Sequence, residues 1–474
     1  MPPALRRRTC LAVVLAAGEG TRMRSARPKV LHKIAGCSML GHVLRSLNAA
    51  GTDHIVIVAG PGQADIGAEA AAAASHAEIV IQAERRGTAH AVLSARDAIA
   101  KSYDDLLVVF ADTPLVRPNT FERMREELCA GDAAVVVLGF ETPRPAGYGR
   151  LILQGGLLTA VREDRDAAED ERSITTCNAG LMAIDGRRAL ALLDEIGDRN
   201  SQKEYYLTDI VAVAAARGLP VTAAMAGEDE VMGVNDRIQL AGAEAILQAR
   251  LREQAMREGV TFVDPSSVTL AFDTKLRRDV VIEPHVVFGP GVEVGEGSLI
   301  RSFSYLEDVT IGENAIIGPF ARLRPGTKLA RDVHIGNFVE VKASEVGAGA
   351  KINHLSYIGD SKVGTKTNIG AGTITCNYDG FKKYKTDIGE HVFIGSQTAL
   401  VAPVKVGDGA YIGAGSVITR DVSADALALT RAPTIEKSGW AQTFREKKGK
   451  QRGTLGKEPN MAGASTCHKT GDGE

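Results

Sequence analysis

The sequence predicts two folds joined in one chain: a doubly wound, mostly parallel α/β sheet, followed by a left-handed parallel β-helix of hexapeptide repeats. In the first half apolar strands alternate with helical segments, and in the second half aliphatic residues recur every six positions. Glycine is enriched, with 51 in 474 residues, whereas aromatic residues make up only 5%. An average chain holds roughly 7% glycine, so tight turns and a core of small aliphatic side chains are expected.

The first half contains four short apolar runs, each followed by a loop and a helix-like segment. Strands that are apolar almost throughout are buried on both faces, as in a parallel sheet covered by helices. The predicted strands are Ala12–Leu15, His54–Ala59, Leu106–Phe110 and Ala134–Leu138, and an Ala-rich helix is predicted at Ala68–Ala74.

A long amphipathic helix is predicted from Asn235 to Gly259. Ile238, Leu247 and Leu251 recur among Arg, Glu and Gln residues, and a glycine ends the pattern. We expect this helix to connect the two folds. The expected domains are therefore 1–234, a linker helix at 235–259, and a β-helix at 260–432.

The aliphatic series of the second half has a period of six. A helix would repeat every 3.6 residues and a strand every two, so the period indicates coils with three flat sides, about 18 residues each. One aliphatic side chain per unit points into the prism, and glycine tolerates the corners. With two slips of one residue and one insertion, the main series is Ile311, Ile317, Leu323, Leu329, Ile335, Val341, Val346, Ile352, Ile358, Val363, Ile369, Ile388, Ile394, Leu400, Val406, Ile412 and Ile418. An earlier, looser series is Ile282, Phe288, Val294, Ile300 and Leu306.

Two segments depart from the repeat. Residues Thr373 to Asp387 form an insertion that we expect to leave the prism as an extruded loop, and such insertions gather on the binding face. The repeats stop after Pro433. Residues 433–474 are expected to be a C-terminal segment with a mobile tail, because the stretch from Trp440 is rich in Lys, Gly, Thr and Ser.

The composition excludes several classes of partner. With 56 basic and 58 acidic residues the net charge is −2, which favours neither a nucleic-acid partner nor a membrane surface. Six scattered cysteines without a C-x-x-C pair indicate free thiols in a reducing compartment. The run Leu11–Ala17 after three arginines resembles a short export signal, but the charged turn that follows favours a buried first strand. We therefore expect a cytoplasmic protein.

The loop after the first strand, LAAGEGTRMRSARPKVLHKIAG, carries the most specific signal. A glycine-rich turn between strand and helix lets backbone N–H groups approach phosphates, and Arg22 and Lys29 add positive charge. The loop is neither a G-x-G-x-x-G nor a G-K-[ST] motif. It closely resembles the loop of sugar-1-phosphate nucleotidyltransferases, which have a Rossmann-like domain. With the hexapeptide repeats, residues 10 to 440 resemble the family of bifunctional N-acetylglucosamine-1-phosphate uridylyltransferases and glucosamine-1-phosphate N-acetyltransferases.

The resemblance implies a nucleotide site in the first domain. Asp112 and Asn235 would hold Mg²⁺, and their hard oxygen ligands suit that ion, although Asp112 could also simply begin a turn before Pro114. Family members commonly have glycine where this chain has Ala111. The additional methyl group could prevent a ligand from approaching the backbone closely at this position. Lys29 would contact the phosphates, and the implied UTP-binding residues are Leu15, Ala16, Ala17, Gly18, Lys29, Gln82, Gly87 and Thr88.

A pocket for N-acetylglucosamine-1-phosphate is implied beside the nucleotide site. Gly149 could equally belong to a hairpin turn, and Glu163 could be a solvated charge. The segment KEYYLTD from Lys203 matches a family segment that begins with glycine instead. The implied sugar-phosphate residues are Gly149, Glu163, Asn178 and Asn235.

The second site is expected in the middle coils of the β-helix. Arg324 and Lys342 are 18 positions apart, one full coil, so they should stack on one face. A lone histidine is more often structural, but His354 lies near these cations and the insertion. The resemblance makes His354 the general base that deprotonates the sugar amine, and near-neutral titration suits histidine to that role.

The resemblance also implies the binding residues of this second reaction. Glucosamine-1-phosphate would be held by Arg324, Lys342, Tyr357, Asn368 and Lys383. Acetyl-CoA would be held by Asn377, Tyr378, Ser396, Ala414 and Arg431. Because a flat-sided prism has no deep pocket, we expect a homotrimer with sites between neighbouring prisms.

Three functions remain open at this point. The first is a bifunctional enzyme that uses acetyl-CoA and then UTP. The second is a nucleotidyltransferase whose β-helix only oligomerises, and His354, Lys342 and the insertion argue against it. The third is a non-catalytic interaction subunit, which intact Lys29, Asp112 and Asn235 disfavour.

Overall fold

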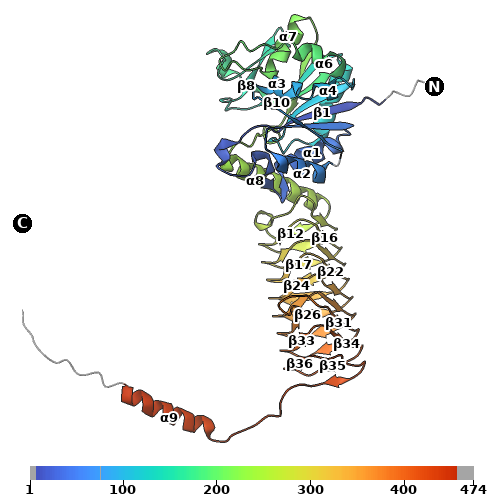
Figure 1. The fold of residues 1–474 in the computed structure, drawn as a ribbon, viewed down its shortest axis with the longest axis vertical. Coiled ribbons are helices and arrows are strands. Elements are labelled where there is room, and N and C mark those ends of the chain that lie inside the picture. The colour runs from blue at the N-terminus through green and yellow to red at the C-terminus, as the bar shows by residue number, and fades with distance from the viewer. Residues whose placement is uncertain (1–6, 75, 456–474) are drawn as a thin grey trace, which may run out of the picture.

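The computed structural model describes residues 7–74 and 76–455 and contains an α/β domain and a long three-sided prism, joined by one helix. Figure 1 shows the α/β domain at one end, the connecting helix beneath it, and the stacked coils of the prism below. The predicted two-part fold is confirmed.

The N-terminal sheet is mixed, and its main path holds one antiparallel strand among parallel ones. β10 runs antiparallel to both β6 and β7, while the other neighbours along the main path are parallel. The four predicted strands correspond to β1, β4, β6 and β7. In spatial order the strands are β11 (Val221–Ala226), β7 (Val135–Glu141), β10 (Thr176–Asp185), β6 (Asp105–Phe110), β1 (Cys10–Leu15), β4 (His54–Ala59) and β5 (Glu78–Ile81).

Helices cover both faces of this sheet. Alternate residues of β1 enter opposite cores, with Ala12 and Val14 on one side and Leu11 and Val13 on the other. One core is covered by α1 (Met39–Ala49), α2 (Ala64–Ala73) and α5 (Pro118–Ala130). The other is covered by α3 (Thr88–Leu93), α4 (Arg96–Ile99), α6 (Gly186–Leu193) and α7 (Ile210–Ala216).

Smaller elements extend the domain. The hairpin β8 (Gly149–Gln154) and β9 (Leu157–Arg162) pairs with β10 at the edge of the sheet. A second hairpin is formed by β2 (Lys33–Ile34) and β3 (Cys37–Ser38). The 3-10 helices of this domain are η1 (Thr21–Met23), η2 (Lys29–Leu31), η3 (Glu171–Ser173) and η4 (Leu207–Asp209), whereas η5 (Pro265–Ser267) lies in the prism.

The long helix predicted for 235–259 corresponds to α8, Arg237–Arg257. Asp236 caps its start, because its carboxylate accepts a hydrogen bond from the Gln239 N–H at 2.8 Å. Farther along, the buried Gln248 side chain both donates to and accepts from the backbone of Leu270. Since Leu270 belongs to the first coil of the prism, this amide joins the helix to the β-helix.

The prism is built from three parallel sheets, which we call the first, second and third faces in chain order. The first face consists of β12 (Thr261–Phe262), β14 (Val281–Ile282), β17 (Leu299–Ile300), β20 (Ile316–Ile317), β23 (His334–Asn337), β26 (Lys351–His354), β29 (Asn368–Ile369), β32 (Phe393–Ile394), β35 (Tyr411–Ile412) and β37 (Leu427–Ala428). The second consists of β15 (Val287–Phe288), β18 (Tyr305–Leu306), β21 (Arg322–Leu323), β24 (Glu340–Lys342), β27 (Tyr357–Gly359), β30 (Ile374–Cys376), β33 (Ala399–Val401) and β36 (Val417–Ile418). The third consists of β13 (Lys275–Leu276), β16 (Val292–Val294), β19 (Val309–Ile311), β22 (Thr327–Leu329), β25 (Glu345–Val346), β28 (Ser361–Val363), β31 (Thr386–Ile388) and β34 (Val404–Val406).

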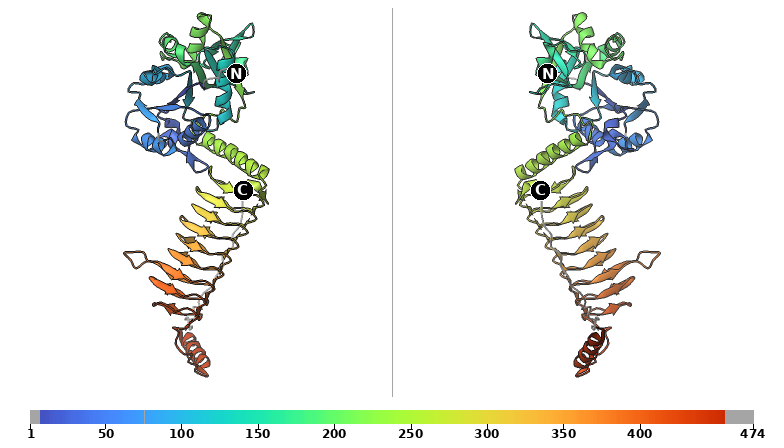
Figure 2. Two further views of the ribbon diagram at one scale, coloured as in Figure 1. Left: turned by 90° about the vertical axis from the view of Figure 1, so that its right-hand side faces the viewer. Right: turned by 90° about the vertical axis from the view of Figure 1, so that its left-hand side faces the viewer.

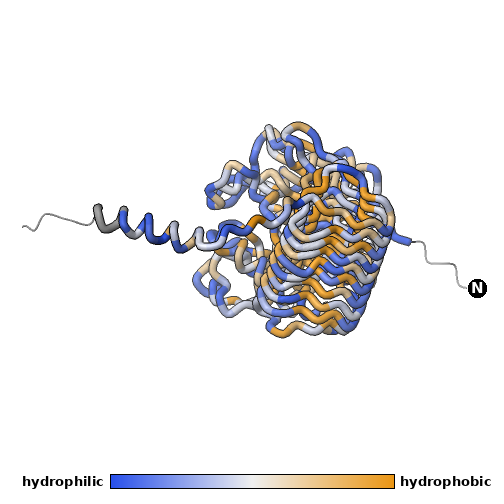
Figure 3. The backbone as a smooth tube through the Cα atoms, turned by 90° about the horizontal axis from the view of Figure 1, so that it is seen from below, coloured by the Kyte–Doolittle hydropathy of each residue, from blue (hydrophilic) through white to orange (hydrophobic). Residues whose placement is uncertain are grey.

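Every aliphatic position of the predicted series is buried in one continuous core. Neighbouring coils align Ile317 with Ile335, 18 positions on, and Val341 with Ile358, 17 positions on, so the slip of one residue is absorbed within a coil. Viewed along the prism, the apolar residues form rows that repeat from coil to coil (Figure 3). The hexapeptide period is therefore the spacing at which side chains enter the core of the prism.

The extruded loop is shorter than the predicted insertion. Ile374–Cys376 and Thr386–Ile388 lie in strands, so only residues 377–385 leave the prism, at the corner between the second and third faces. Tyr378 and Lys383 form an antiparallel bridge that closes the loop into a hairpin. The loop projects from the orange part of the prism in Figure 2.

The segment predicted to be a mobile tail forms a helix over part of its length. α9 spans Trp440–Leu455 and lies beyond the last coil, joined to it by an extended stretch (Figure 1). The predicted tail after residue 455 lies outside the described residues. In the described part of the chain, no helix is both long enough and apolar enough to cross a membrane.

Candidate functional site

A cavity of about 350 Å³ opens at the carboxyl ends of the central strands of the α/β domain. In open α/β sheets ligands bind at this edge, because the loops after the strands converge there. All eight residues implied to bind UTP line this cavity: Leu15, Ala16, Ala17, Gly18, Lys29, Gln82, Gly87 and Thr88.

Three polar residues from distant parts of the chain meet at the edge of this cavity, which Lys29 and Asp112 line. Lys29 begins η2, Asp112 follows β6, and Asn235 precedes α8. The Lys29 ammonium is nearly buried; it forms an ion pair with Asp112 and donates to Oδ1 of Asn235 at 3.1 Å. The structure thus brings together the cation and both oxygen ligands that the sequence nominated.

The same oxygens fit the implied Mg²⁺. They converge on a single point of positive charge, the Lys29 ammonium, and carboxylate and amide oxygens are ligands of the type that Mg²⁺ accepts. The described residues include no cluster of three His, Cys, Asp or Glu side chains suited to a metal. Mg²⁺ in nucleotide enzymes needs only one or two protein ligands beside the substrate phosphates.

Gly87 can only be glycine in this backbone. Its φ is +115°, and an added Cβ would lie 2.5 Å from the carbonyl oxygen of Tyr205. Thr88 Oγ1 accepts a hydrogen bond from the Leu207 N–H at 2.9 Å, and Gln82 Nε2 donates to the carbonyl of Gly87 at 3.3 Å. These contacts hold the wall of the cavity against the 205–207 segment.

A second cavity, also about 350 Å³, adjoins the first and shares Thr88, Phe110 and Asp112 with it. All four residues implied to bind the sugar phosphate line it: Gly149, Glu163, Asn178 and Asn235. Asp112 and Asn235 therefore lie where a nucleotide in one cavity would meet a sugar phosphate in the other.

Glu163 is not the solvated charge that its sequence context allowed. Burial raises the pKa of its carboxyl group above the ordinary range, although a hydrogen bond from the Thr208 hydroxyl at 3.0 Å opposes the shift. The nearby Asp209 carboxylate adds to the rise. Glu163 is thus a pocket residue that accepts hydrogen bonds.

The two departures from the family pattern have simple structural accounts. Ala111 is fully buried in the core, and its N–H donates to the Leu15 carbonyl at 3.0 Å. Its methyl group therefore packs away from both cavities. Lys203 has a φ of +53°, the left-handed conformation that glycine adopts most readily, so the family's glycine suits the backbone required there.

Two charged residues of the nucleotide cavity were missed by sequence reasoning. Arg85 and Glu204 line it beside Lys29, whereas Arg22, expected to add positive charge, is exposed and is not part of the lining. Arg85 lies in the segment QAERRGT, which also contains Gln82, Gly87 and Thr88, but nothing in the spacing separates it from Arg86. Its position in the cavity wall, with a hydrogen bond to the Ala17 carbonyl at 3.1 Å, is visible only in the structure.

In the β-helix, His354 ends β26 at the corner between the first and second faces. Its Nδ1 lies 2.8 Å from Oδ1 of Asn337, the residue directly opposite in the preceding coil. The amide oxygen accepts from Nδ1–H, which leaves the lone pair of Nε2 available to take a proton. Asn337 was not nominated, because its role depends on coil stacking.

The nominated cations lie at the other edge of the second face. Arg324 and Lys342 stack as predicted, since Leu323 pairs with Val341 and Arg324 donates its backbone N–H to the Val341 carbonyl. Lys342 Nζ lies 3.4 Å from Asp360. Asp360 also accepts from the amide of Asn377, so it links the prism to the extruded loop.

Lys383 reaches back from the loop to this cluster. Its contact with the ammonium of Lys342 lowers the pKa of Lys383, because two like charges are held close together. A Lys383 amine that has given up its proton accepts a hydrogen bond from the Lys342 ammonium, and this bond, together with the Asp360 carboxylate, raises the pKa of Lys342. Tyr357 completes the group, with its hydroxyl 3.5 Å from the amide nitrogen of Asn377.

One protomer does not bring all nominated residues of this second site together. Lys342, Lys383, Asn377 and Tyr378 lie at or beyond the corner between the second and third faces. His354 lies at the opposite edge of the second face. Asn368 begins β29 on the first face, opposite Lys351 at the start of β26. Ser396 and Ala414 follow strands of the first face, and Arg431 donates to the carbonyl of Ala414 at 2.9 Å.

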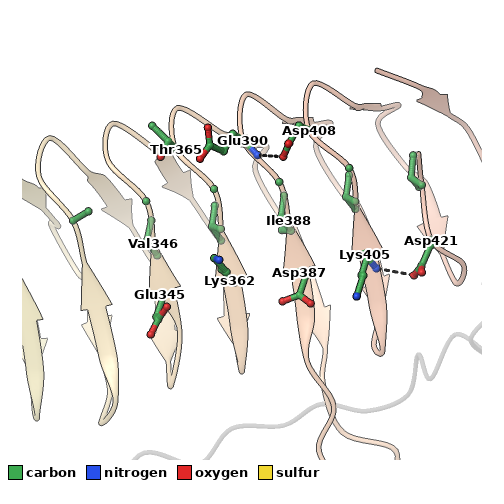
Figure 4. Close-up of a pocket in the computed structure, with 18 of the residues that line it drawn as sticks. Glu345, Val346, Lys362, Thr365, Asp387, Ile388, Glu390, Lys405, Asp408 and Asp421 are labelled. Carbon is green, nitrogen blue, oxygen red and sulfur yellow. Dashed lines mark hydrogen bonds between the residues drawn. The ribbon is translucent and has the colours of Figure 1, made fainter. Parts of the chain in front are cut away.

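A larger groove, about 1060 Å³, runs along the third face and contains none of the nominated residues. Its outward side chains alternate in charge from strand to strand, and each lies directly opposite its neighbour. The series is Lys328, Glu345, Lys362, Asp387 and Lys405, of which the last four are labelled in Figure 4. Opposite charges on facing positions stabilise a sheet, so this surface has a structural explanation.

Comparison with known proteins gives consistent similarities for both halves. The MobA-like NTP transferase domain matches residues 12–182, and the bacterial transferase hexapeptide family (six repeats) matches residues 308–343 and 385–420. The chain is 56% identical to the bifunctional protein GlmU of Azorhizobium caulinodans over 445 residues, which cover 94% of this chain and 99% of that protein. It is 57% identical to that of Bradyrhizobium sp. over 444 residues, with the same coverage, and 50% identical to that of Bartonella quintana over 438 residues, with coverage of 92% and 98%.

Proposed function

The chain belongs to the family of bifunctional GlmU proteins, and from this premise we propose which of its residues carry out the two reactions. It is an enzyme of UDP-N-acetylglucosamine synthesis, with N-acetylglucosamine-1-phosphate uridylyltransferase and glucosamine-1-phosphate N-acetyltransferase activities. We assign uridylyl transfer to residues 1–234 and acetyl transfer to 260–432. The helix at 235–259 links them, and 433–474 is a C-terminal segment.

Uridylyl transfer is assigned to the two joined cavities. The sugar phosphate, held by Gly149, Glu163, Asn178 and Asn235, attacks the α-phosphorus of UTP in line and releases pyrophosphate. Lys29 neutralises charge on the phosphates, and the cavity walls orient both substrates, which accounts for most of the catalysis in phosphoryl transfer. Mg²⁺ bound by Asp112 and Asn235 would supply further neutralisation of the triphosphate.

The observation that carries this assignment is the convergence of Lys29, Asp112 and Asn235. They are brought together from positions more than 80 residues apart, at the boundary between the two cavities. No general base is required, because the attacking group is already a phosphate oxygen.

Acetyl transfer is assigned to the middle coils. Nε2 of His354 takes a proton from the amine of glucosamine-1-phosphate, and the amine attacks the acetyl carbonyl of acetyl-CoA. The C–S bond of the thioester then breaks, and coenzyme A leaves and takes up the proton as its thiol. Arg324, Lys342, Tyr357, Asn368 and Lys383 would hold the sugar phosphate. Asn377, Tyr378, Ser396, Ala414 and Arg431 would hold the acetyl donor. The hydrogen bond from His354 to Asn337 supports the role of the imidazole as base.

We propose a homotrimer in which neighbouring prisms complete the acetyl-transfer sites. Within one protomer the binding residues are divided between the first face, the second face and the extruded loop, so a neighbour's residues are needed to close the site. An exposed stripe supports a second copy of this chain as the occupant. His285, Phe303, Phe320 and Phe338 stack at successive corners with ring centroids about 5 Å apart, and Leu355 continues the stripe beside His354. Exposed apolar patches of this kind mark interfaces.

The site assignments are tested by measuring both activities of a His354→Ala variant. Loss of the general base should lower acetyl transfer by about 10²–10⁴ and leave uridylyl transfer unchanged. His391, exposed at the opposite corner, is the matched control, and His391→Ala should retain both activities. Loss of both activities, or of neither, in His354→Ala would contradict the assignment.

The assembly is tested by light scattering. We expect a mass three times that of the 50.1 kDa chain. A Phe320→Glu substitution should yield monomers with impaired acetyl transfer and intact uridylyl transfer. A monomeric wild-type protein would overturn the trimer.

The substrates indicate where the enzyme works. UTP and acetyl-CoA are cytoplasmic metabolites, and the five cysteines among the described residues are free thiols. We propose a cytoplasmic enzyme whose partners are small-molecule substrates and further copies of its own chain.

A further inference from the structure

Two cations line the nucleotide cavity among the described residues, Lys29 and Arg85, and each contacts a carboxylate. Lys29 pairs with Asp112, and Arg85 pairs with Glu19. The first pair belongs to the proposed phosphate and metal site. The second has no role in the assignments above, although it lies in the same cavity wall.

Arg85 lies across the ends of two central strands. Its Nε donates to the carbonyl of Ala17, the residue immediately before Gly18 in the glycine-rich loop, at 3.1 Å. A Cβ placed on Gly60, which follows β4, would lie 3.2 Å from Nη2 of Arg85. The guanidinium is therefore fixed at the carboxyl ends of β1 and β4, where α/β sheets bind phosphates.

One contact of this guanidinium is with the backbone, and the other is with an exposed side chain that a ligand could displace. The Ala17 carbonyl belongs to the backbone and anchors Nε. The Glu19 side chain is 61% exposed and that of Arg85 is 42% exposed, and ion pairs as exposed as this contribute little to stability. A triphosphate repels the Glu19 carboxylate and offers several oxygens to the planar fork of the arginine, a strongly favoured geometry.

We propose that Arg85 is a second triphosphate-binding residue, which Glu19 holds in position until UTP arrives. On binding, Nη1 exchanges the Glu19 carboxylate for a phosphate oxygen while Nε stays on Ala17. In the absence of UTP, the Glu19 carboxylate thus occupies the position that a phosphate oxygen takes when the substrate binds. The inference rests on the proposed nucleotide site and adds a binding residue to it.

The test compares UTP affinity, measured by calorimetry with Mg²⁺ present, in Arg85→Gln and Glu19→Gln. Arg85→Gln should bind UTP about 10-fold more weakly, as expected for one charge-assisted hydrogen bond at a partly exposed site. Glu19→Gln should bind UTP two- to five-fold more tightly, because the competing carboxylate is gone. If the ion pair merely braces the loop, both variants lose affinity alike, and that result would overturn the proposal.

A double variant and a neighbouring arginine sharpen the test. In Arg85→Gln the further change Glu19→Gln should give a smaller gain than it gives alone, because the two residues are coupled. Arg86→Gln is the matched control, since Arg86 stacks on Tyr205 outside the cavity lining, with its guanidinium 5.0 Å from the ring centroid. This control should bind UTP within two-fold of wild type.

Lys29→Ala separates this inference from the nucleotide site itself. Weakened UTP binding in Lys29→Ala together with unchanged binding in Arg85→Gln would overturn only the role of Arg85. Unchanged UTP binding in Lys29→Ala would overturn the proposed site and this inference with it. Uridine, which has no phosphate, should bind Arg85→Gln and wild type equally, and a loss of uridine binding would mean that Arg85 acts only on the cavity wall.

Discussion

Asn337 and His354 lie directly opposite each other on adjacent coils, with the amide oxygen 2.8 Å from Nδ1 of the imidazole. The two residues are 17 positions apart, which is one turn of the prism, so the stacking of adjacent coils brings them together. Because the amide oxygen can only accept, it holds the proton on Nδ1 and directs the basic Nε2 away from the strand.

Asn337→Ala should therefore slow acetyl transfer about 10-fold through loss of orientation, with unchanged uridylyl transfer as the internal control. Asn337→Asp keeps the acceptor and adds a negative charge, which stabilises the imidazolium. It should retain more activity than the alanine variant and move the acidic limb of the pH–rate profile to higher pH. If Asn337 had only a structural role, the acidic limb of the pH–rate profile would be the same in Asn337→Asp as in wild type.

Asp112→Asn should abolish most uridylyl transfer, because one of the two proposed metal ligands loses its charge. A reduction of at least about 10² is expected, comparable to the loss of one electrostatic group at a phosphoryl-transfer site. Removing divalent metal with a chelator should have the same selective effect. Asp132→Asn, an exposed surface change, serves as the control. Acetyl transfer should be unchanged by all three treatments. Loss of acetyl transfer with the chelator would contradict the assignment of the metal site to uridylyl transfer alone.

Two glycines of the nucleotide cavity should respond differently to alanine. An added Cβ at Gly18 meets nothing within 4 Å and projects into open space, so Gly18→Ala should keep its melting temperature and raise KM for UTP. At Gly87 the same methyl group strikes the Tyr205 backbone in a left-handed conformation. Gly87→Ala should lower the free energy of unfolding by roughly 1–3 kcal/mol. Thermal melts and steady-state kinetics on both variants separate the two effects.

Glu163 makes stability depend on pH. Burial raises the pKa of its carboxyl group, so the folded protein binds this proton more tightly than the unfolded chain does. Its contribution to stability is present below the pKa of an ordinary glutamate and is lost as pH rises through the raised folded pKa. Glu163→Gln should therefore gain melting temperature relative to wild type as pH rises from 4 to 8. Glu122→Gln, an exposed change on α5, should show no such trend, and a flat difference for Glu163→Gln would disprove the desolvation argument.

Local pattern was most informative where the structure itself repeats. The six-residue period placed every residue of the predicted series in the core of the prism, because each coil meets only its two neighbours and the same steric rule applies at each level. The short apolar runs located β1, β4, β6 and β7 for the same reason: a strand buried on both faces is apolar throughout.

Pattern was least informative where distant segments meet. Neither the antiparallel direction of β10 nor the hairpin β8–β9 could be predicted from local sequence, since strand direction depends on the path of the intervening chain. The predicted insertion was too long at both ends, because Ile374–Cys376 and Thr386–Ile388 form strands that pair with adjacent coils. α9 was missed because its composition is that of a solvated tail.

The sequence by itself determined the two folds and the stacking of Arg324 on Lys342, and it nominated the catalytic and binding residues. These follow from periodicity, from residue chemistry and from resemblance, all of which are properties of a linear string. Only the tertiary structure decided which groups hold those residues in place: Asn337 on His354, Asp360 between Lys342 and Asn377, Arg85 on Ala17, and Asn235 beside Lys29. The physical reason is that hydrogen bonds and ion pairs act over about 3 Å in space, and chain separation has no bearing on them.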